Sequence, residues 1–110
     1  MTNREVAMAY LKHFCAGDVD DLASLLADDL EFKGPFHQFS SSTAYLQSLR
    51  DDPLGRCYYR VLSVTEDDDR VSVYYDYQKP NGDLTVAQLF SFTDGKISKM
   101  LLVFDASGFA

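Results

Sequence analysis

Tyrosine and phenylalanine are the residues of this sequence whose numbers first suggest a chemistry. Among 110 residues there are seven tyrosines and eight phenylalanines, and there is no tryptophan. A buried tyrosine hydroxyl needs a hydrogen-bond partner, so seven tyrosines favour an amphipathic cavity or an interface over a purely apolar core. A cavity of this kind would accept a small apolar or aromatic molecule and donate hydrogen bonds to its polar atoms.

Histidine is the side chain whose ordinary pKa, about 6.5, suits proton transfer at neutral pH. Of the two histidines, His37 lies in a loop after the Gly34-Pro35 break and is the candidate general base, with a merely exposed histidine as the alternative. His13 is expected to be exposed. The two cysteines, Cys15 and Cys57, have no metal-site spacing and are expected to be small buried hydrophobes in a reduced compartment. We therefore expect neither a metal nor an organic cofactor.

The first half of the chain carries helical signals that would position these residues. Apolar residues recur at helical spacing from Glu5 to Phe14, with Thr2 or Asn3 available as the N-cap and Gly17 as the C-terminal stop. Asp18 can cap a second helix, in which three leucines form an apolar stripe, namely Leu22, Leu25 and Leu26. A short strand with alternating Leu30 and Phe32 follows, and then a third helix carries Ala44, Tyr45 and Leu49 and ends before Pro53.

The second half reads as four strands separated by turn signals. The acidic run EDDD, the dipeptide Asn81-Gly82 and the dipeptide Asp94-Gly95 separate the runs CYYRVLSVT, RVSVYYDYQK, LTVAQLFSFT and KISKMLLVF. Glycine accepts the positive φ that two-residue hairpin loops demand, so an antiparallel meander is predicted. Helices followed by strands are typical of the α+β class.

Hairpin geometry assigns the residues of the meander to two faces. With Asn81-Gly82 as a two-residue loop, paired residue numbers sum to 163, so Tyr77 faces Val86 and Tyr75 faces Gln88. One face is then apolar and aromatic, with Gln88 as the polar residue in its middle. Three helices packed on the concave side of a strongly curved sheet would leave a cone open at one end, and cones of this kind hold ligands.

These residues resemble a known superfamily over nearly the whole chain. The order of elements, the Gly17-Asp18 pair before a leucine-rich helix, the segment ADDLEFKGPF and the final DGKISKMLLVFD are similar to nuclear transport factor 2-like proteins with the cystatin-like fold. The SnoaL-like and ketosteroid isomerase-like members match best. The resemblance implies a single domain over residues 1–110, an α+β cone of order α-α-β-α-β-β-β-β, and dimerisation through the outer face of the sheet.

The resemblance also implies roles for individual residues. The position of the oxyanion tyrosine in isomerase-like members is Tyr10, and that of the second oxyanion donor is Gln88, whose amide can still donate a hydrogen bond. The usual proton-shuttling aspartate falls at Gly34, so ketosteroid isomerase activity by the family mechanism is improbable. His37, three residues further on, would have to replace that base. Alternatively, Tyr10 simply bonds to Gln88 inside a filled core.

Other residues are candidates for the cavity or for a different reaction. We expect the substrate-binding wall to comprise Phe36, Tyr75, Tyr77, Phe90, Met100 and Phe104. Tyr75 and Tyr77 would be either plain wall or hydrogen-bonding groups. A bulge in the last strand would exchange inward-facing Met100 and Phe104 for Leu101 and Val103. Arg60 and Asp76 resemble part of a limonene epoxide hydrolase-like arrangement, although the pairing places Asp76 on the face opposite Gln88.

Charge and hydropathy exclude several classes of partner. With 17 acidic and 10 basic residues, the net charge of −7 disfavours nucleic acid and anionic membrane surfaces. No apolar run is long enough to span a bilayer and no signal peptide is recognised, so a cytoplasmic location is expected. Two hypotheses remain. One is an isomerase-, cyclase- or dehydratase-type enzyme with a Tyr/Gln oxyanion site; the other is a non-catalytic ligand-binding or dimerisation module.

Overall fold

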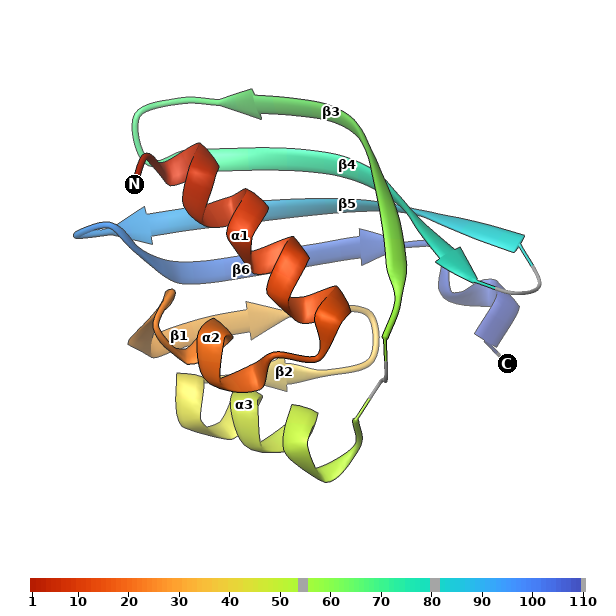
Figure 1. Cartoon of the computed structure of the whole chain (residues 1–110), viewed down its shortest axis with the longest axis horizontal. Helices are drawn as coiled ribbons and strands as arrows, with labels where there is room; N and C mark the ends of the chain where they lie inside the picture. The colour runs from red at the N-terminus through yellow and green to blue at the C-terminus, as the bar shows by residue number, and fades with distance from the viewer. Residues whose placement is uncertain (54–55, 80–81, 110) are drawn as a thin grey trace.

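The computed structural model describes residues 1–53, 56–79 and 82–109, which form one α+β unit (Figure 1). Its helices are α1 (Asn3–Ala16), α2 (Val19–Ala23) and α3 (Ser42–Asp51). Its strands are β1 (Leu26–Lys33), β2 (Gln38–Phe39), β3 (Tyr58–Glu66), β4 (Arg70–Lys79), β5 (Gly82–Thr93) and β6 (Lys96–Phe104), followed by a 3₁₀ turn, η1 (Ala106–Phe109). The predicted fold class is confirmed, with the two-residue strand β2 as an addition.

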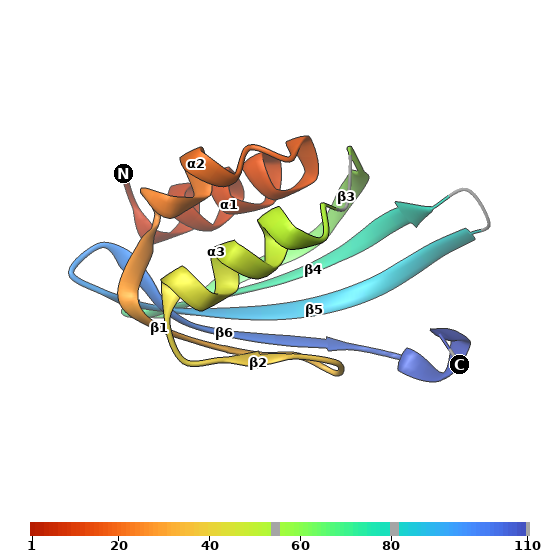
Figure 2. The ribbon, with the colours of Figure 1, turned by 90° about the horizontal axis from the view of Figure 1, so that it is seen from below.

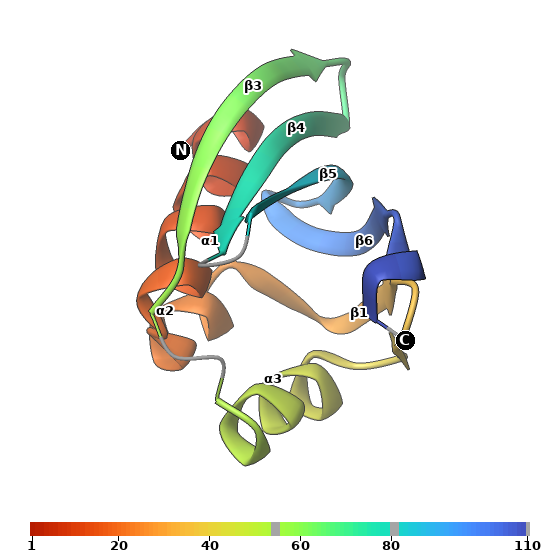
Figure 3. The same cartoon turned by 90° about the vertical axis from the view of Figure 1, so that its right-hand side faces the viewer.

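The strands form one six-stranded sheet in the order β2-β1-β6-β5-β4-β3. All neighbouring pairs are antiparallel except β1 and β6, which run parallel. The three helices lie on one side of the sheet (Figure 2), and the sheet curves around that side, with α1 and α3 at opposite parts of its concave face (Figure 3). No helix in the described part of the chain is long and apolar enough to cross a bilayer.

The helix ends follow the sequence signals, with one exception. Thr2 caps α1 in a capping box with Glu5, and Gly17 ends the helix with a φ of 78°. Ser41 caps α3 by accepting a hydrogen bond from the amide of Ala44. The predicted second helix is too long, because α2 ends at Ala23 and Leu26 already belongs to β1, opposite Ile97. Three leucines at this spacing fit either element, and the parallel pairing with β6 decides for the strand.

The hairpin between β4 and β5 has the predicted faces but not the predicted register. Tyr77 lies opposite Leu84, Tyr75 opposite Val86, and Lys79 opposite Gly82. Each residue of β4 therefore pairs with a β5 residue two positions before the predicted one. The predicted turn residue Asn81 lies outside the described residues. A shift by two residues restores the same side of each strand, so the aromatic face is retained. The second hairpin is as predicted: Asp94 and Gly95 form its loop, both with positive φ.

The core lies between the helices and the concave face of the sheet. Leu11 of α1, Leu22 of α2, Leu30 of β1 and Phe90 of β5 are among its fully buried side chains. In β6 the inward residues include Met100, which is buried, whereas Leu101 and Val103 are exposed on the other face. Of the two phases that the sequence leaves open for the last strand, the structure has the one in which Met100 faces inward.

Candidate active site

A cavity of about 560 Å³ opens between α1, α3 and the concave face of the sheet. This volume is in the range that holds a small organic molecule. Its lining includes seven residues that the sequence predicts as site residues: Tyr10, Phe36, His37, Tyr75, Tyr77, Gln88 and Phe104. Four further aromatic side chains line it: Phe14, Phe32, Phe39 and Tyr45. The abundance of aromatic residues is thus concentrated around one cavity.

Tyr10 lies in the middle of α1, one helical turn after Val6, on the stripe that faces the sheet. Its ring packs edge-on against Phe90, with the ring centres 5.4 Å apart. Its hydroxyl forms a hydrogen bond with the hydroxyl of Tyr45, which α3 carries over the cavity. Only 2% of Tyr10 is exposed. We call these two groups the hydroxyl pair.

Gln88 holds the polar position in the centre of the concave face. Its carbonyl Oε1 accepts a hydrogen bond of 2.8 Å from the hydroxyl of Tyr75, and its Nε2 donates to the Sδ atom of Met100 at 3.4 Å. A thioether sulfur is a weak acceptor, so the amide N–H groups retain capacity for a better one. Gln88 is buried and lines the cavity, so a new partner for its amide must be a molecule inside the cavity.

Burial raises the pKa values of the tyrosines around Gln88. Desolvation is the largest cause for Tyr10, Tyr45 and Tyr75. For Tyr10, the neighbouring Tyr45 raises the pKa further, while a hydrogen bond with Gln88 lowers it. All three phenols therefore remain neutral hydrogen-bond donors at physiological pH.

The hydroxyl pair carries one more proton than its shared hydrogen bond uses. Each tyrosine hydroxyl has one proton and can also accept. Whichever of Tyr10 and Tyr45 donates, the proton of the other remains for a third acceptor. Together with the amide of Gln88, which among the described residues has only the Met100 sulfur and the Tyr10 hydroxyl as acceptors, this proton gathers several hydrogen-bond donors at the inner end of the cavity. An oxygen atom that bears negative charge or a strong dipole is the complementary ligand group.

The mouth of the cavity has a different chemistry. His37 is exposed there, and its ring stacks on that of Phe39 with the centres 5.9 Å apart. Asp51 and Asp52, at the end of α3, also line the mouth and are exposed. No hydrogen bond between described residues joins His37 to the hydroxyl pair or to Gln88. A base at His37 would thus act on the outer part of a bound molecule.

Two predicted wall residues lie behind the lining. Phe90 is fully buried between the sheet and the ring of Tyr10, and Met100 is buried as the acceptor for Gln88. Neither lines the cavity, because Tyr10 and Gln88 cover them. Tyr45 is the main site residue that the sequence did not reveal. Its contact with Tyr10 joins residues 35 positions apart and depends on how α3 crosses the sheet.

Arg60 and Asp76 form an ion pair of 2.7 Å on the outer face of the sheet, as the face assignment predicts. Thr85 donates a second hydrogen bond to Asp76 at 2.8 Å, and these hydrogen bonds lower the pKa of its carboxyl. Neither charged residue lines the cavity. This pair therefore stabilises neighbouring strands and does not complete an epoxide hydrolase-like site inside the cone.

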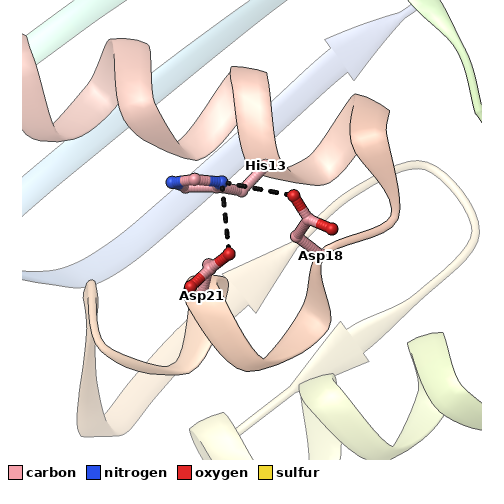
Figure 4. Close-up of side chains that lie close together, drawn as sticks. All are labelled: His13, Asp18 and Asp21. Carbon is pink, nitrogen blue, oxygen red and sulfur yellow. Dashed lines mark ion pairs between the residues drawn. The ribbon is translucent and has the colours of Figure 1, made fainter.

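One group of side chains among the described residues could hold a metal ion: His13, Asp18 and Asp21 (Figure 4). Nδ1 of His13 lies 3.7 Å from a carboxylate oxygen of Asp18 and 3.8 Å from one of Asp21. His13 is partly buried, so the prediction that it is exposed is wrong. Both aspartates are exposed. None of them lines the cavity. A protonated His13 would tie α1 to α2 and would interact favourably with the C-terminal end of the α1 dipole.

The chain matches the family model described as a SnoaL-like domain over residues 7–100. No match was found among curated proteins. Solved structures with the same fold include a nuclear transport factor 2-like protein of unknown function from Cytophaga hutchinsonii. That protein is 17% identical, with a TM-score of 0.86 over 99% of this chain and 95% of the other.

Two further solved structures carry functional descriptions. A candidate ketosteroid isomerase from Kribbella flavida is 19% identical, with a TM-score of 0.82 over 94% of this chain and 77% of the other. An LEH-like epoxide hydrolase from Mycobacterium tuberculosis is 18% identical, with a TM-score of 0.76 over 93% of this chain and 81% of the other. At these identities the likeness establishes the fold, and one fold hosts many reactions.

Proposed function

Because this chain belongs to the SnoaL-like domain family, we propose that it binds a small, flat, apolar molecule in the cavity and holds an oxygen of that molecule at its inner end. The observation that carries this proposal is the group of hydrogen-bond donors formed by the hydroxyl pair and the amide of Gln88. The aromatic walls would bury the ring system of the ligand. A carbonyl, enolate or phenolate oxygen would accept the spare hydrogen bonds.

A catalytic role would use the same donors with His37 as the base. His37 would remove a proton from a carbon conjugated to the bound oxygen, and the hydroxyl pair and Gln88 would stabilise the negative charge that develops on that oxygen. The position of His37 in the cavity lining supports this role. This chemistry would place the protein with isomerases, cyclases or dehydratases. Without it, the protein would be a ligand carrier of the same fold.

Titration with 2-naphthol tests the binding site, because this phenol is flat and presents one oxygen. We expect saturable binding, measured by the fluorescence of naphthol. Tyr10→Phe should weaken this binding at least tenfold, about 1.4 kcal/mol. The phenylalanine keeps the ring against Phe90 and removes only the hydroxyl. Tyr58→Phe is the matched control, because Tyr58 is exposed and does not line the cavity.

The same titration contains the results that would contradict the proposal. Absence of saturable binding to the folded wild-type protein would mean that aromatic side chains fill the cone themselves. Equal affinities of wild type and Tyr10→Phe for naphthol would show that the hydroxyl pair does not bind the oxygen of the ligand. Circular dichroism of each variant checks that the fold is retained. His37→Ala separates binding from catalysis. This variant should still bind naphthol, since the base is not required to hold the oxygen, and it would lose only the catalytic role.

We also propose that two copies of the chain pair through the outer face of the sheet. Three large side chains stand exposed there on the two strands that flank β5: Tyr74 in β4, and Leu101 and Val103 in β6. In the sheet, Tyr74 and Val103 flank Ala87 on either side, which forms one continuous apolar row. Contiguous apolar patches on a small protein commonly mark an interface.

Val103→Lys is expected to weaken this dimer at least tenfold. In a two-fold symmetric interface the substitution enters twice, so two new charges lose water and face each other. Val103→Thr, which has nearly the same shape and no charge, should change the dissociation constant much less. Sedimentation velocity over the micromolar range measures both. A wild-type protein that remains monomeric over that range would contradict the proposed dimer.

A further inference from the structure

Cys15 and Cys57, far apart in sequence, lie next to each other in the fold. Cys15 is in the last turn of α1 and Cys57 directly precedes β3. The amide of Cys57 donates a hydrogen bond of 2.8 Å to the carbonyl oxygen of Cys15. With standard bond lengths, this hydrogen bond limits the Cα–Cα separation to about 6.7 Å. Disulfide bonds join Cα atoms roughly 4.4 to 6.8 Å apart, so the backbones already stand at a suitable distance.

The two side chains also interact with each other. Burial raises the pKa of the Cys15 thiol, and interaction with the neighbouring Cys57 side chain raises it further. Both cysteines are free thiols; Cys15 is buried, whereas Cys57 is partly exposed. A small reagent can therefore reach Cys57 more readily than Cys15. Cys57 is thus the thiol that reacts first with an oxidant, and Cys15 is the resolving thiol that closes the disulfide.

We propose that Cys15 and Cys57 form a reversible intramolecular disulfide, with a small disulfide such as glutathione disulfide as the oxidant. The thiolate of Cys57 attacks one sulfur of glutathione disulfide and releases one glutathione thiolate, which takes a proton from water. Cys15 then attacks the Cys57 sulfur of the mixed disulfide, and its proton passes through water to the second glutathione, which leaves as a thiol. In sum, two protein thiols are oxidised to one disulfide and one glutathione disulfide is reduced to two glutathione molecules.

The proposed bond would act on the framework of the cavity. It would join the end of α1 to the start of β3, which are otherwise linked through α2, β1, β2 and α3. The side chain of Cys57 also interacts with the hydroxyl of Tyr77, which lines the cavity. The redox state of the pair would therefore change the hydrogen-bond partner of a wall residue. This inference rests on the two cysteines alone and does not require the proposed ligand.

The test treats fully reduced protein with excess glutathione disulfide and follows free thiols and intact mass. We expect both thiols to disappear with a mass loss of two hydrogen atoms, and dithiothreitol to restore both. Cys15→Ser should instead stop at a mixed disulfide with one glutathione on Cys57. The closed bridge should also raise the melting temperature by at least about 5 °C, because it shortens the free loop of the unfolded chain.

Three results would overturn the proposal. Wild-type protein that retains two free thiols under these conditions lacks the predicted reactivity. Wild-type protein that accumulates the mixed disulfide without releasing glutathione shows that Cys15 does not resolve it. A product that runs as a covalent dimer on a non-reducing gel places the bond between chains instead of within one.

Discussion

Replacement of Phe90 by alanine is expected to lower the free energy of unfolding by about 3 to 5 kcal/mol. Phe90 is fully buried at the centre of the sheet, between the strands that carry Val71 and Met100, and it supports the ring of Tyr10. The substitution leaves a cavity that these rigid neighbours cannot fill. A domain of this size has a total stability of about 5 to 15 kcal/mol, so this one change removes a large part of it.

Urea denaturation of Phe90→Ala measures this loss. Phe90→Leu is the matched control, because it retains most of the buried volume and should cost only about 1 kcal/mol. Binding of 2-naphthol adds a second readout, since Phe90 lies behind the lining and Phe90→Leu should bind nearly as wild type does. A loss below about 1.5 kcal/mol for Phe90→Ala, with an unchanged denaturant slope, would mean that the site collapses around the smaller side chain.

Alkaline pH is expected to destabilise the fold steeply above pH 10. Burial raises the pKa values of Tyr10, Tyr45 and Tyr75 in the folded state above that of tyrosine in the unfolded chain, about 10. Their stabilising contribution is complete below that unfolded value. It falls as pH rises, because the unfolded chain releases protons that the folded chain retains. Each such tyrosine contributes a fall of up to about 1.4 kcal/mol per pH unit.

Urea midpoints between pH 8 and 11, together with the absorbance of tyrosinate, test this prediction. Tyr45→Phe removes one of these hydroxyls, so the stability of this variant should fall less steeply with pH than that of the wild type. Tyr58→Phe, at an exposed tyrosine outside the proposed dimer row, should leave the slope unchanged. The prediction is wrong if all seven tyrosines ionise near pH 10 in the folded protein while the urea midpoint stays constant.

The fold was predictable because its signals are local. Thr2, Gly17 and Ser41 mark helix ends through hydrogen bonds and φ values that involve their own neighbours. The faces of β4 and β5 were also predictable, since the alternation of Tyr75, Tyr77 and Gln88 survives a register error of two residues. The strand β2 was missed because two residues, Gln38 and Phe39, carry no periodicity.

The candidate site was only partly predictable because it depends on contacts between distant segments. Tyr10 and Gln88 could be placed on inward faces by helical and strand periodicity. The partner of Tyr10 could not be placed, since nothing in the sequence near Tyr45 fixes how α3 crosses the sheet. The same limit applies to Phe90 and Met100: a pattern assigns them to the inner face, but only the packing shows that other side chains cover them.

The parallel pairing of β1 with β6 has a consequence for synthesis of the chain. Phe32 in β1 lies beside Met100 in β6, whereas its other neighbour, β2, offers only two residues. As translation proceeds from the N-terminus, the first half of the protein leaves the ribosome long before its main strand partner exists. The inner sides of α1 and β1 therefore lack their partner strand until β6 has been made, so the sheet is completed late in folding.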